Sequence, residues 1–335
     1  MPVMPGTTAL LELLTQEGVR VLFGNPGTTK LPLMDALATE HELRYVLALQ
    51  EAAAMGMAGG YAQASGGLAV VNLHVAPGLG NAMGMLYDAQ KAGSPVLVTA
   101  GQHEQGFNLT EPLLWADLQM IARPFVKWSA EVRQLSDLPR AIHRAAKTAL
   151  APPTGPVFLS LPGDILLASG ELDFGEPTRI ASAIRGDARA IAAAAELLAK
   201  AESPAIIAGD AVPQHDALHE LVELAELLGA SVYDEGMASR AMFPSSHPLY
   251  HGALVRLPGA IRSMLEQHDL LVAIGADLFT LPLPGDVASL PDRMPVVQRP
   301  ASPDEIAAAI LFLTSAESSF VTGIAMPVDG GRTFH

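Results

Sequence analysis

Short, continuously apolar runs recur along this chain, and Gly or Pro bounds most of them. Because the runs do not alternate between apolar and polar residues, strands built from them must be buried on both faces. In the first half we predict strands at residues 20–24, 44–49, 68–73, 95–99 and 156–161. Helical patterns lie between them, near residues 7–17, 51–64, 81–92, 111–121 and 135–150. This order predicts an α/β fold in which helices cover both faces of a parallel sheet.

The rhythm breaks at residues 171–188, which we interpret as a linker, and then resumes. The second half predicts strands at residues 204–209, 231–234, 270–275 and 295–298, with helices at residues 190–201 and 216–228. The predicted fold class is therefore α/β, with two consecutive Rossmann-like parallel-sheet domains at residues 1–170 and 189–298.

A separate helix–strand unit is predicted for the tail at residues 299–335. Its helix begins with a capping box, in which Ser302 is the N-cap, Pro303 is at N1 and Glu305 is at N3. We expect a strand at residues 323–328 to join the second sheet in parallel and complete it, covered by the apolar face of Ile306, Ile310 and Leu313.

Composition excludes several classes of protein. The formal net charge of −15 disfavours nucleic-acid and anionic-membrane partners, which require clustered Lys and Arg. The absence of Cys excludes disulfides, thiolate metal sites and a Cys nucleophile, and it makes the cytoplasm the default location. No apolar run approaches the ~18–20 residues of a membrane span, and the N-terminus lacks a basic leader region.

One carboxylate stands in an apolar stretch without a basic neighbour. Glu51 lies in VLALQEAAAMGMAGGYAQ, directly after a predicted strand. It can be a first-turn residue that faces the helix dipole in solvent. Alternatively it is a buried acid whose raised pKa lets it exchange a proton with a ligand nitrogen. Composition leaves both interpretations open.

Two further strand ends carry candidate residues. GNPGTT, residues 24–29, joins a strand to a helix and can bind a polar ligand or be a simple turn. His74 ends another strand before a Gly-rich loop, where it can be catalytic or only structural. Because three candidates follow three consecutive strands, we expect a binding site at one edge of the sheet.

Taken in order, these segments resemble a known family. VLFGNPGTTKLP, RYVLALQEAAAMGMAGGYAQASG, NLHVAPGLGNAMG, SPVLVTAGQ, RPFVKWS and GPVFLSLPGD look like the pyrimidine-binding domain of thiamine-diphosphate enzymes. Within that family the chain is most similar to benzoylformate decarboxylase-like 2-oxo-acid decarboxylases. The resemblance covers about residues 5–298, and the second half resembles the family's middle domain.

The resemblance implies roles for named residues. Glu51 would hydrogen-bond the pyrimidine N1′ of thiamine diphosphate, with a high pKa maintained by its apolar surroundings. His74 would be the active-site histidine, and Thr28 replaces a serine that contacts the substrate carboxylate. The implied residues of the cofactor loops are Asn25, Pro26, Gly27, Gly78 and Asn81.

The family pattern is incomplete in this sequence. Family members hold the diphosphate through Mg²⁺ with a GDG motif and a later Asn-Asn pair, and neither occurs here. A second catalytic histidine has no match in residues 275–286. The resemblance thus implies a truncated or chimeric 2-oxo-acid decarboxylase or carboligase that supplies the pyrimidine half-site, offers no metal ligands and has little activity alone.

Other readings concern partners and the tail. The family implies a homo-oligomer formed through the pyrimidine domain. The alternative is a non-catalytic assembly or regulatory subunit that pairs with a protein carrying the diphosphate domain. Residues 299–335 resemble the end of short-chain dehydrogenases, but an NAD-dependent dehydrogenase is the least favoured function because TGxxxGxG is absent. The middle domain gives no strong signal for a flavin or nucleotide.

Overall fold

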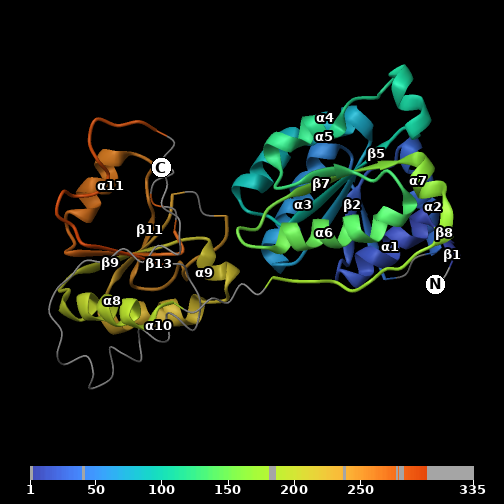
Figure 1. Ribbon diagram of the computed structural model, residues 1–335. Helices are drawn as coiled ribbons and strands as arrows, with labels where there is room; N and C mark the ends of the chain where they lie inside the picture. Colours follow the sequence, from blue (N-terminus) through green and yellow to red (C-terminus); the bar gives the residue numbers. More distant parts are fainter. Residues whose placement is uncertain are drawn as a thin grey trace. The chain divides into compact units, whose positions relative to one another are not determined.

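The computed structural model describes residues 3–39, 42–180, 186–236, 239–276, 278 and 283–299. The chain divides into two compact units, Met1–Ser182 and Ala183–His335, and each has its own parallel sheet (Figure 1). The α/β class with two parallel-sheet domains, predicted from the sequence, is confirmed. The predicted tail at residues 299–335 lies outside the described residues, apart from the backbone of Arg299.

The first unit is built on a six-stranded sheet in the order β3-β2-β4-β5-β7-β6, with every neighbouring pair parallel. Its strands are β2 (Val21–Gly24), β3 (Arg44–Leu47), β4 (Ala69–Leu73), β5 (Val96–Gln102), β6 (Ser129–Glu131) and β7 (Val157–Pro162). From β2 the chain first forms β3 on one side and then places β4 on the other. The direction of strand addition therefore reverses between β2 and β4, the position where doubly wound sheets bind ligands.

Helices cover both faces of this sheet (Figure 1). Val70 of β4 packs into the core beneath α1 (Gly6–Gln16) and α6 (Leu138–Leu150), whereas Val71 faces α3 (Glu51–Ser65) and α4 (Val75–Lys91). The remaining helices are α2 (Leu31–Thr39), α5 (Leu118–Ala122) and α7 (Gly163–Leu167), with 3₁₀ turns η1 (Thr28–Lys30), η2 (Gln105–Thr110), η3 (Arg123–Phe125) and η4 (Leu135–Asp137). Burial on both faces explains why the strands are continuously apolar.

Two predicted helices differ from the observed ones. The helix expected at residues 81–92 begins at Val75, because Pro77 lies in the first turn, where its missing N–H costs no hydrogen bond. The helix expected at residues 111–121 is reduced to α5, since Leu114 adopts a φ of 75°, which is incompatible with a continuous helix.

The second unit repeats the architecture with a five-stranded parallel sheet, in the order β11-β10-β9-β12-β13. Its strands are β9 (Pro204–Ala208), β10 (Ser231–Asp234), β11 (Tyr250–Ala253), β12 (Leu270–Ile274) and β13 (Val296–Arg299). Residues of α8 (Ala188–Lys200) and α10 (Leu218–Leu228) pack on one core, and residues of α11 (Pro258–Leu265) pack on the other; α9 (Ala211–Gln214) is a single turn. Throughout the described part of the chain, no helix is long and apolar enough to cross a membrane.

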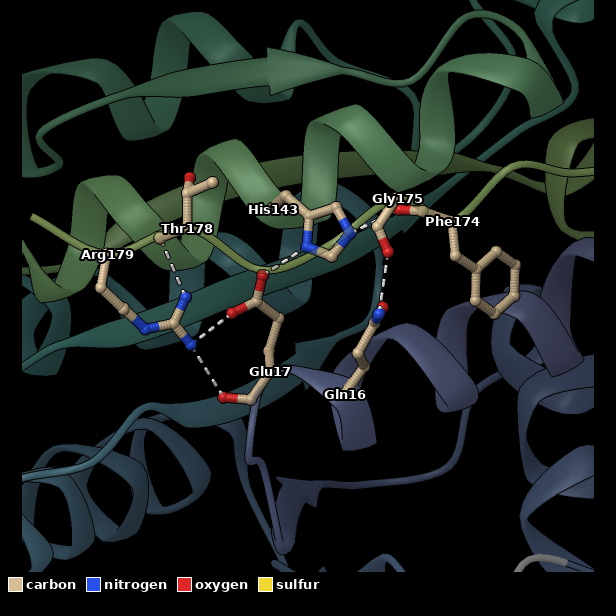
Figure 2. A network of polar contacts seen from close by, with 7 residues as sticks. All are labelled: Gln16, Glu17, His143, Phe174, Gly175, Thr178 and Arg179. Atoms are coloured by element: carbon tan, nitrogen blue, oxygen red, sulfur yellow. Dashed lines mark hydrogen bonds and ion pairs between the residues drawn. The ribbon is translucent and has the colours of Figure 1, made fainter.

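A buried acid at the end of α1 fastens the segment that leads out of the first unit (Figure 2). The Glu17 side chain is fully buried, and its Oε1 lies 2.5 Å from Nδ1 of His143 in α6. Arg179 contacts the other carboxylate oxygen at 2.5 Å and donates to the Glu17 carbonyl at 3.2 Å. His143 in turn lies 2.7 Å from the Phe174 carbonyl through Nε2.

The same segment is held at two further places. Gln16 donates a side-chain hydrogen bond to the Gly175 carbonyl at 2.9 Å. Just before it, β8 (Ser169–Glu171) pairs antiparallel with β1 (Val3–Pro5). The stretch predicted as a linker is therefore bound to the first unit over at least residues 171–179.

Removing the Glu17 carboxylate should destabilise the first unit. We expect Glu17→Ala to lower its free energy of unfolding by about 3 kcal/mol, because a buried partner of His143 is lost. Urea titration followed by Trp fluorescence measures this unit selectively, since Trp115 and Trp128 are the only tryptophans. The control Arg140→Ala removes an exposed ion pair and should cost less than about 1 kcal/mol. Equal losses in the two variants would contradict a stabilising role for Glu17.

Candidate functional site

The three loops singled out in the sequence meet at the carboxyl edge of the first sheet. Asn25 follows β2, Glu51 opens α3 after β3, and His74 follows β4. These strands are neighbours in the order β3-β2-β4, so the topology alone places the three side chains around the point where strand addition reverses.

The Glu51 carboxylate is buried, and both of its oxygens accept hydrogen bonds. Asn25 donates to Oε1 from Nδ2 at 3.0 Å, and Asn81 of α4 donates to Oε2 at 3.1 Å. The preceding residue, Gln50, caps α3 by accepting from the backbone N–H of Ala52 at 2.7 Å. The cap fixes the start of the helix and thereby the direction of the Glu51 side chain.

A lysine that the sequence analysis did not single out completes this network. Lys30 is only 1% exposed, and its Nζ donates to Asn25 Oδ1 and to the Asn72 carbonyl, each at 3.1 Å. Glu51 has no basic neighbour in its own stretch of sequence. Its nearby cation, Lys30, comes from the loop after the adjacent strand β2. The segment GNPGTTKLP could have indicated this lysine as a site residue, since Lys30 follows a strand that ends at the same edge of the sheet.

This network overturns the expected pKa of Glu51. Burial alone would raise the pKa of Glu51, but hydrogen bonds from Asn25 and Asn81, together with the charge of Lys30, bring it below its ordinary value. The prediction of a high pKa is therefore wrong for the ligand-free chain. The apolar residues adjacent to Glu51 in sequence are not the groups that surround its carboxylate in space. Burial also lowers the pKa of Lys30 to about 8, although Glu51 opposes that shift.

His74 lies against the loop that follows β2. Its Nδ1 is 3.3 Å from the Thr29 hydroxyl, and a Cβ added to Gly27 would lie 2.6 Å from the same nitrogen. Burial lowers the pKa of His74, the charge of Lys30 lowers it further, and Glu51 opposes both effects. The imidazole is consequently neutral at pH 7, and the Thr29 hydroxyl can serve either tautomer.

The turn between β4 and α4 is strained next to His74. Val75 has a φ of 40°, a genuine outlier for a β-branched residue and one that costs about 1–3 kcal/mol. Three residues later, Gly78 permits a close approach, because an added Cβ would lie 3.2 Å from Glu51 Oε1 and 3.3 Å from His74 Cβ. Strain and close packing thus bring the two candidate residues together.

Other predicted residues occupy the rim of this cluster. Pro26 and Thr28 are exposed, and among the described residues the hydroxyl that contacts His74 belongs to Thr29. Asn81 is also exposed overall, although its amide reaches Glu51. The described ranges contain no group of three or more His, Asp or Glu residues that could hold a metal ion.

Together these residues form a defined chemical arrangement. An ionised carboxylate is ready to accept a hydrogen bond from a ligand N–H or to take up a proton, and a neutral imidazole nearby can transfer one. Gly27 and Gly78 let the backbone pack closely against these two groups.

Comparison with known proteins identifies the two units. Residues 4–119 match the family described as thiamine pyrophosphate enzyme, N-terminal TPP binding domain. Residues 191–311 match the thiamine pyrophosphate enzyme central domain. The first match contains every candidate residue of the site, and the second contains the whole described sheet of the second unit.

Several relatives share both units. Benzoylformate decarboxylase from Pseudomonas aeruginosa is 36% identical over 307 residues, which are 90% of this chain and 57% of that protein. The acetolactate synthase large subunit from Mycobacterium tuberculosis is 32% identical over 314 residues, 90% of this chain and 49% of that one. The structure of 4-hydroxybenzoylformate decarboxylase from Rhodococcus jostii RHA1 aligns with a TM-score of 0.82 at 32% identity, covering 97% of this chain and 60% of that one.

These alignments also show how much of each relative is covered. The chain spans about half the length of the curated relatives that it matches. Within that span, the sequence motifs, the sheet order and the two domain matches agree. The chain carries the N-terminal TPP binding domain and the central domain of thiamine pyrophosphate enzymes, and its relatives include a benzoylformate decarboxylase and an acetolactate synthase.

Proposed function

We propose that these residues supply the pyrimidine-binding half of a thiamine-diphosphate site in a 2-oxo-acid decarboxylase or carboligase. The observation that carries this proposal is the Glu51 carboxylate, which is held by two side-chain amides beside His74 at the switch point of the sheet. When bound, thiamine diphosphate supplies the nucleophilic carbon and the electron sink that decarboxylation of a 2-oxo acid needs.

The residues at hand fit the pyrimidine end of that cofactor. A ring with adjacent nitrogen donors and acceptors can be bound by a carboxylate partner. Glu51 provides that partner, and Gly27 and Gly78 allow the backbone to approach His74 and Glu51 closely. In this role Glu51 binds a ring nitrogen and exchanges a proton with it, while Asn25 and Asn81 orient the carboxylate.

His74 and Thr28 would act on the substrate side. A neutral imidazole can donate a proton to, or accept one from, a group on the substrate. The contact of Thr28 with a substrate carboxylate, and the placing of Pro26 in the cofactor loop, rest on the family resemblance and remain predictions.

We infer that the Mg²⁺-diphosphate half of the site comes from outside these residues. The sequence has neither the GDG motif nor the Asn-Asn pair, and the chain covers 57% of its decarboxylase relative. The resemblance of residues 299–335 to short-chain dehydrogenases remains a prediction, and the central-domain match extends into this segment as far as residue 311.

Neutralising Glu51 should weaken binding of thiamine, which carries the pyrimidine ring without phosphate. We expect Glu51→Gln to raise the dissociation constant about tenfold or more, because a charge-assisted hydrogen bond is lost. Saturation-transfer NMR measures this, and in the wild type the pyrimidine proton should receive more saturation than the thiazole side chain. The matched control Glu12→Gln removes an exposed charge from α1 and should leave binding unchanged. Unaltered binding by Glu51→Gln would refute the proposed role of Glu51.

The chain alone should be nearly inactive. With Mg²⁺, thiamine diphosphate and benzoylformate, we expect no release of CO₂ above the uncatalysed rate, because the residues that grip the diphosphate are missing. Calorimetry on the same samples would report the affinity for the whole cofactor. Micromolar binding together with turnover would contradict the half-site proposal.

A second candidate function is that of an assembly subunit. One relative is itself named a large subunit, and three leucines near the candidate edge are strongly exposed. Leu49 is 98% exposed two residues before Glu51, and Leu109 and Leu113 are 94% and 86% exposed in the segment after β5. Apolar side chains this exposed would mark a protein interface if they form one patch. The proposed contact is with a second copy, or with a partner that carries the diphosphate domain.

This candidate predicts an oligomer that depends on those leucines. Size-exclusion chromatography with light scattering should give a mass at least twice the 35.0 kDa of one chain. The double variant Leu49→Asp, Leu113→Asp should shift the mass to that of a monomer, since charges in an interface are costly. Leu227→Asp, exposed in the second unit, is the control and should change nothing. A monomeric wild type would argue against assembly through this edge.

A further inference from the structure

Lys30 is among the largest fully buried side chains of the described residues, and lysine is rarely buried without a reason. It belongs to η1, and its ammonium group reaches inward to Asn25 Oδ1 and the Asn72 carbonyl. Both contacts are uncharged. The proposed function assigns Lys30 no part, although its charge acts on both Glu51 and His74.

The hydrogen bonds of Lys30 determine how Asn25 is oriented. An ammonium group only donates, so it must face the amide oxygen of Asn25. The amide nitrogen of Asn25 then points to Glu51, to which it donates at 3.0 Å. Without a donor at position 30, the Asn25 amide could rotate and set its oxygen against the carboxylate. Two hydrogen bonds therefore run in one direction, from Lys30 to Asn25 and from Asn25 to Glu51, and we call this chain of donors the relay.

Other ionisable groups near the relay do not replace Lys30. His74 is neutral at pH 7, and His103, which follows β5, acts on His74. Burial raises the pKa of Tyr45 to about 12, which leaves its phenol uncharged in the physiological range. Among these groups, Lys30 is therefore the cation whose charge lowers the pKa of Glu51.

We propose that Lys30 is a positioning residue that acts through Asn25 to orient the Glu51 carboxylate and to hold it in the ionised form. Its effect on Glu51 is a property of the ligand-free chain. Its effect on cofactor binding rests on the proposed function, because only there does Glu51 meet a ring nitrogen.

The direct test is the titration of Glu51 in the absence of thiamine. The variant Lys30→Met keeps the length and apolar stem of the side chain but removes the charge and the donor. Carbon-13 NMR of labelled glutamate carboxyls, with the Glu51 signal assigned by its loss in Glu51→Gln, should show the titration midpoint of Glu51 raised by about one pH unit or more. Asn25→Ala breaks the relay without removing the lysine. It should raise the midpoint at least as much, because the hydrogen bond from Asn25 lowers the pKa of Glu51 more than the charge of Lys30 does.

Lys127→Met is the matched control. Lys127 is an exposed lysine of the first unit whose pKa is also lowered by desolvation, and it donates to the carbonyls of Thr148 and Ala151, away from the candidate site. This variant should leave the Glu51 midpoint unchanged. An unshifted Glu51 in Lys30→Met, or an equal shift in Lys127→Met, would overturn the proposal.

Stability against pH provides a second readout that needs only a folded protein. The pKa of Lys30 is lowered from 10.5 to about 8 on folding, so between these values the unfolded chain binds more protons than the folded one. The free energy of unfolding should therefore rise with pH between about 8 and 10.5 in the wild type, and this rise should be smaller in Lys30→Met. Identical pH profiles would overturn the burial of a charged Lys30.

The thiamine experiment separates the two proposals. If Lys30→Met shifts the midpoint of Glu51 while Glu51→Gln leaves thiamine binding unchanged, the relay stands and the proposed function fails. If Glu51→Gln weakens binding while Lys30→Met leaves the Glu51 midpoint unchanged, the function stands and the relay fails.

Discussion

Burying a carboxylate is costly unless donors replace the water that it loses, and the candidate site depends on how this chain supplies those donors to Glu51. They come from three elements: Asn25 after β2, Asn81 on α4, and Lys30, which acts through Asn25. None of these is near Glu51 in sequence. They meet because strand addition reverses between β2 and β4, so that consecutive loops end side by side.

Much of this arrangement follows from the sequence, because buried parallel strands have a distinctive pattern. The five predicted strands of the first sheet are all present, and the loops with Asn25, Glu51 and His74 converge as strand ends in one sheet must. Sequence reasoning missed the contacts between residues that are distant in the chain. A neighbouring loop supplies Lys30, so the apolar run around Glu51 gave the wrong sign for its pKa shift. Likewise, Leu114 at a φ of 75° prevents the helix over residues 111–121 that composition alone favoured, and only α5 forms.

The fold explains why the backbone is strained at Val75. Val75 is held at a φ of 40° between a fully buried strand and a long helix, both fixed by the core. This turn brings His74 against Gly27, and Gly78 one turn later comes close to Glu51. The packing of α3 and α4 on the sheet thereby sets the separation of the acid and the imidazole, and the conformational cost is borne by the surrounding structure.

One buried cation disfavours protonation of both groups. The charge of Lys30 favours the ionised carboxylate of Glu51 and disfavours a protonated His74, so it lowers both pKa values. The Glu51 carboxylate is thereby held ready to accept a hydrogen bond or a proton, and the His74 imidazole is held neutral. Because a single charge performs both tasks, loss of the Lys30 proton would alter Glu51 and His74 together. The pH dependence of this site therefore belongs to the cluster and cannot be assigned to one residue.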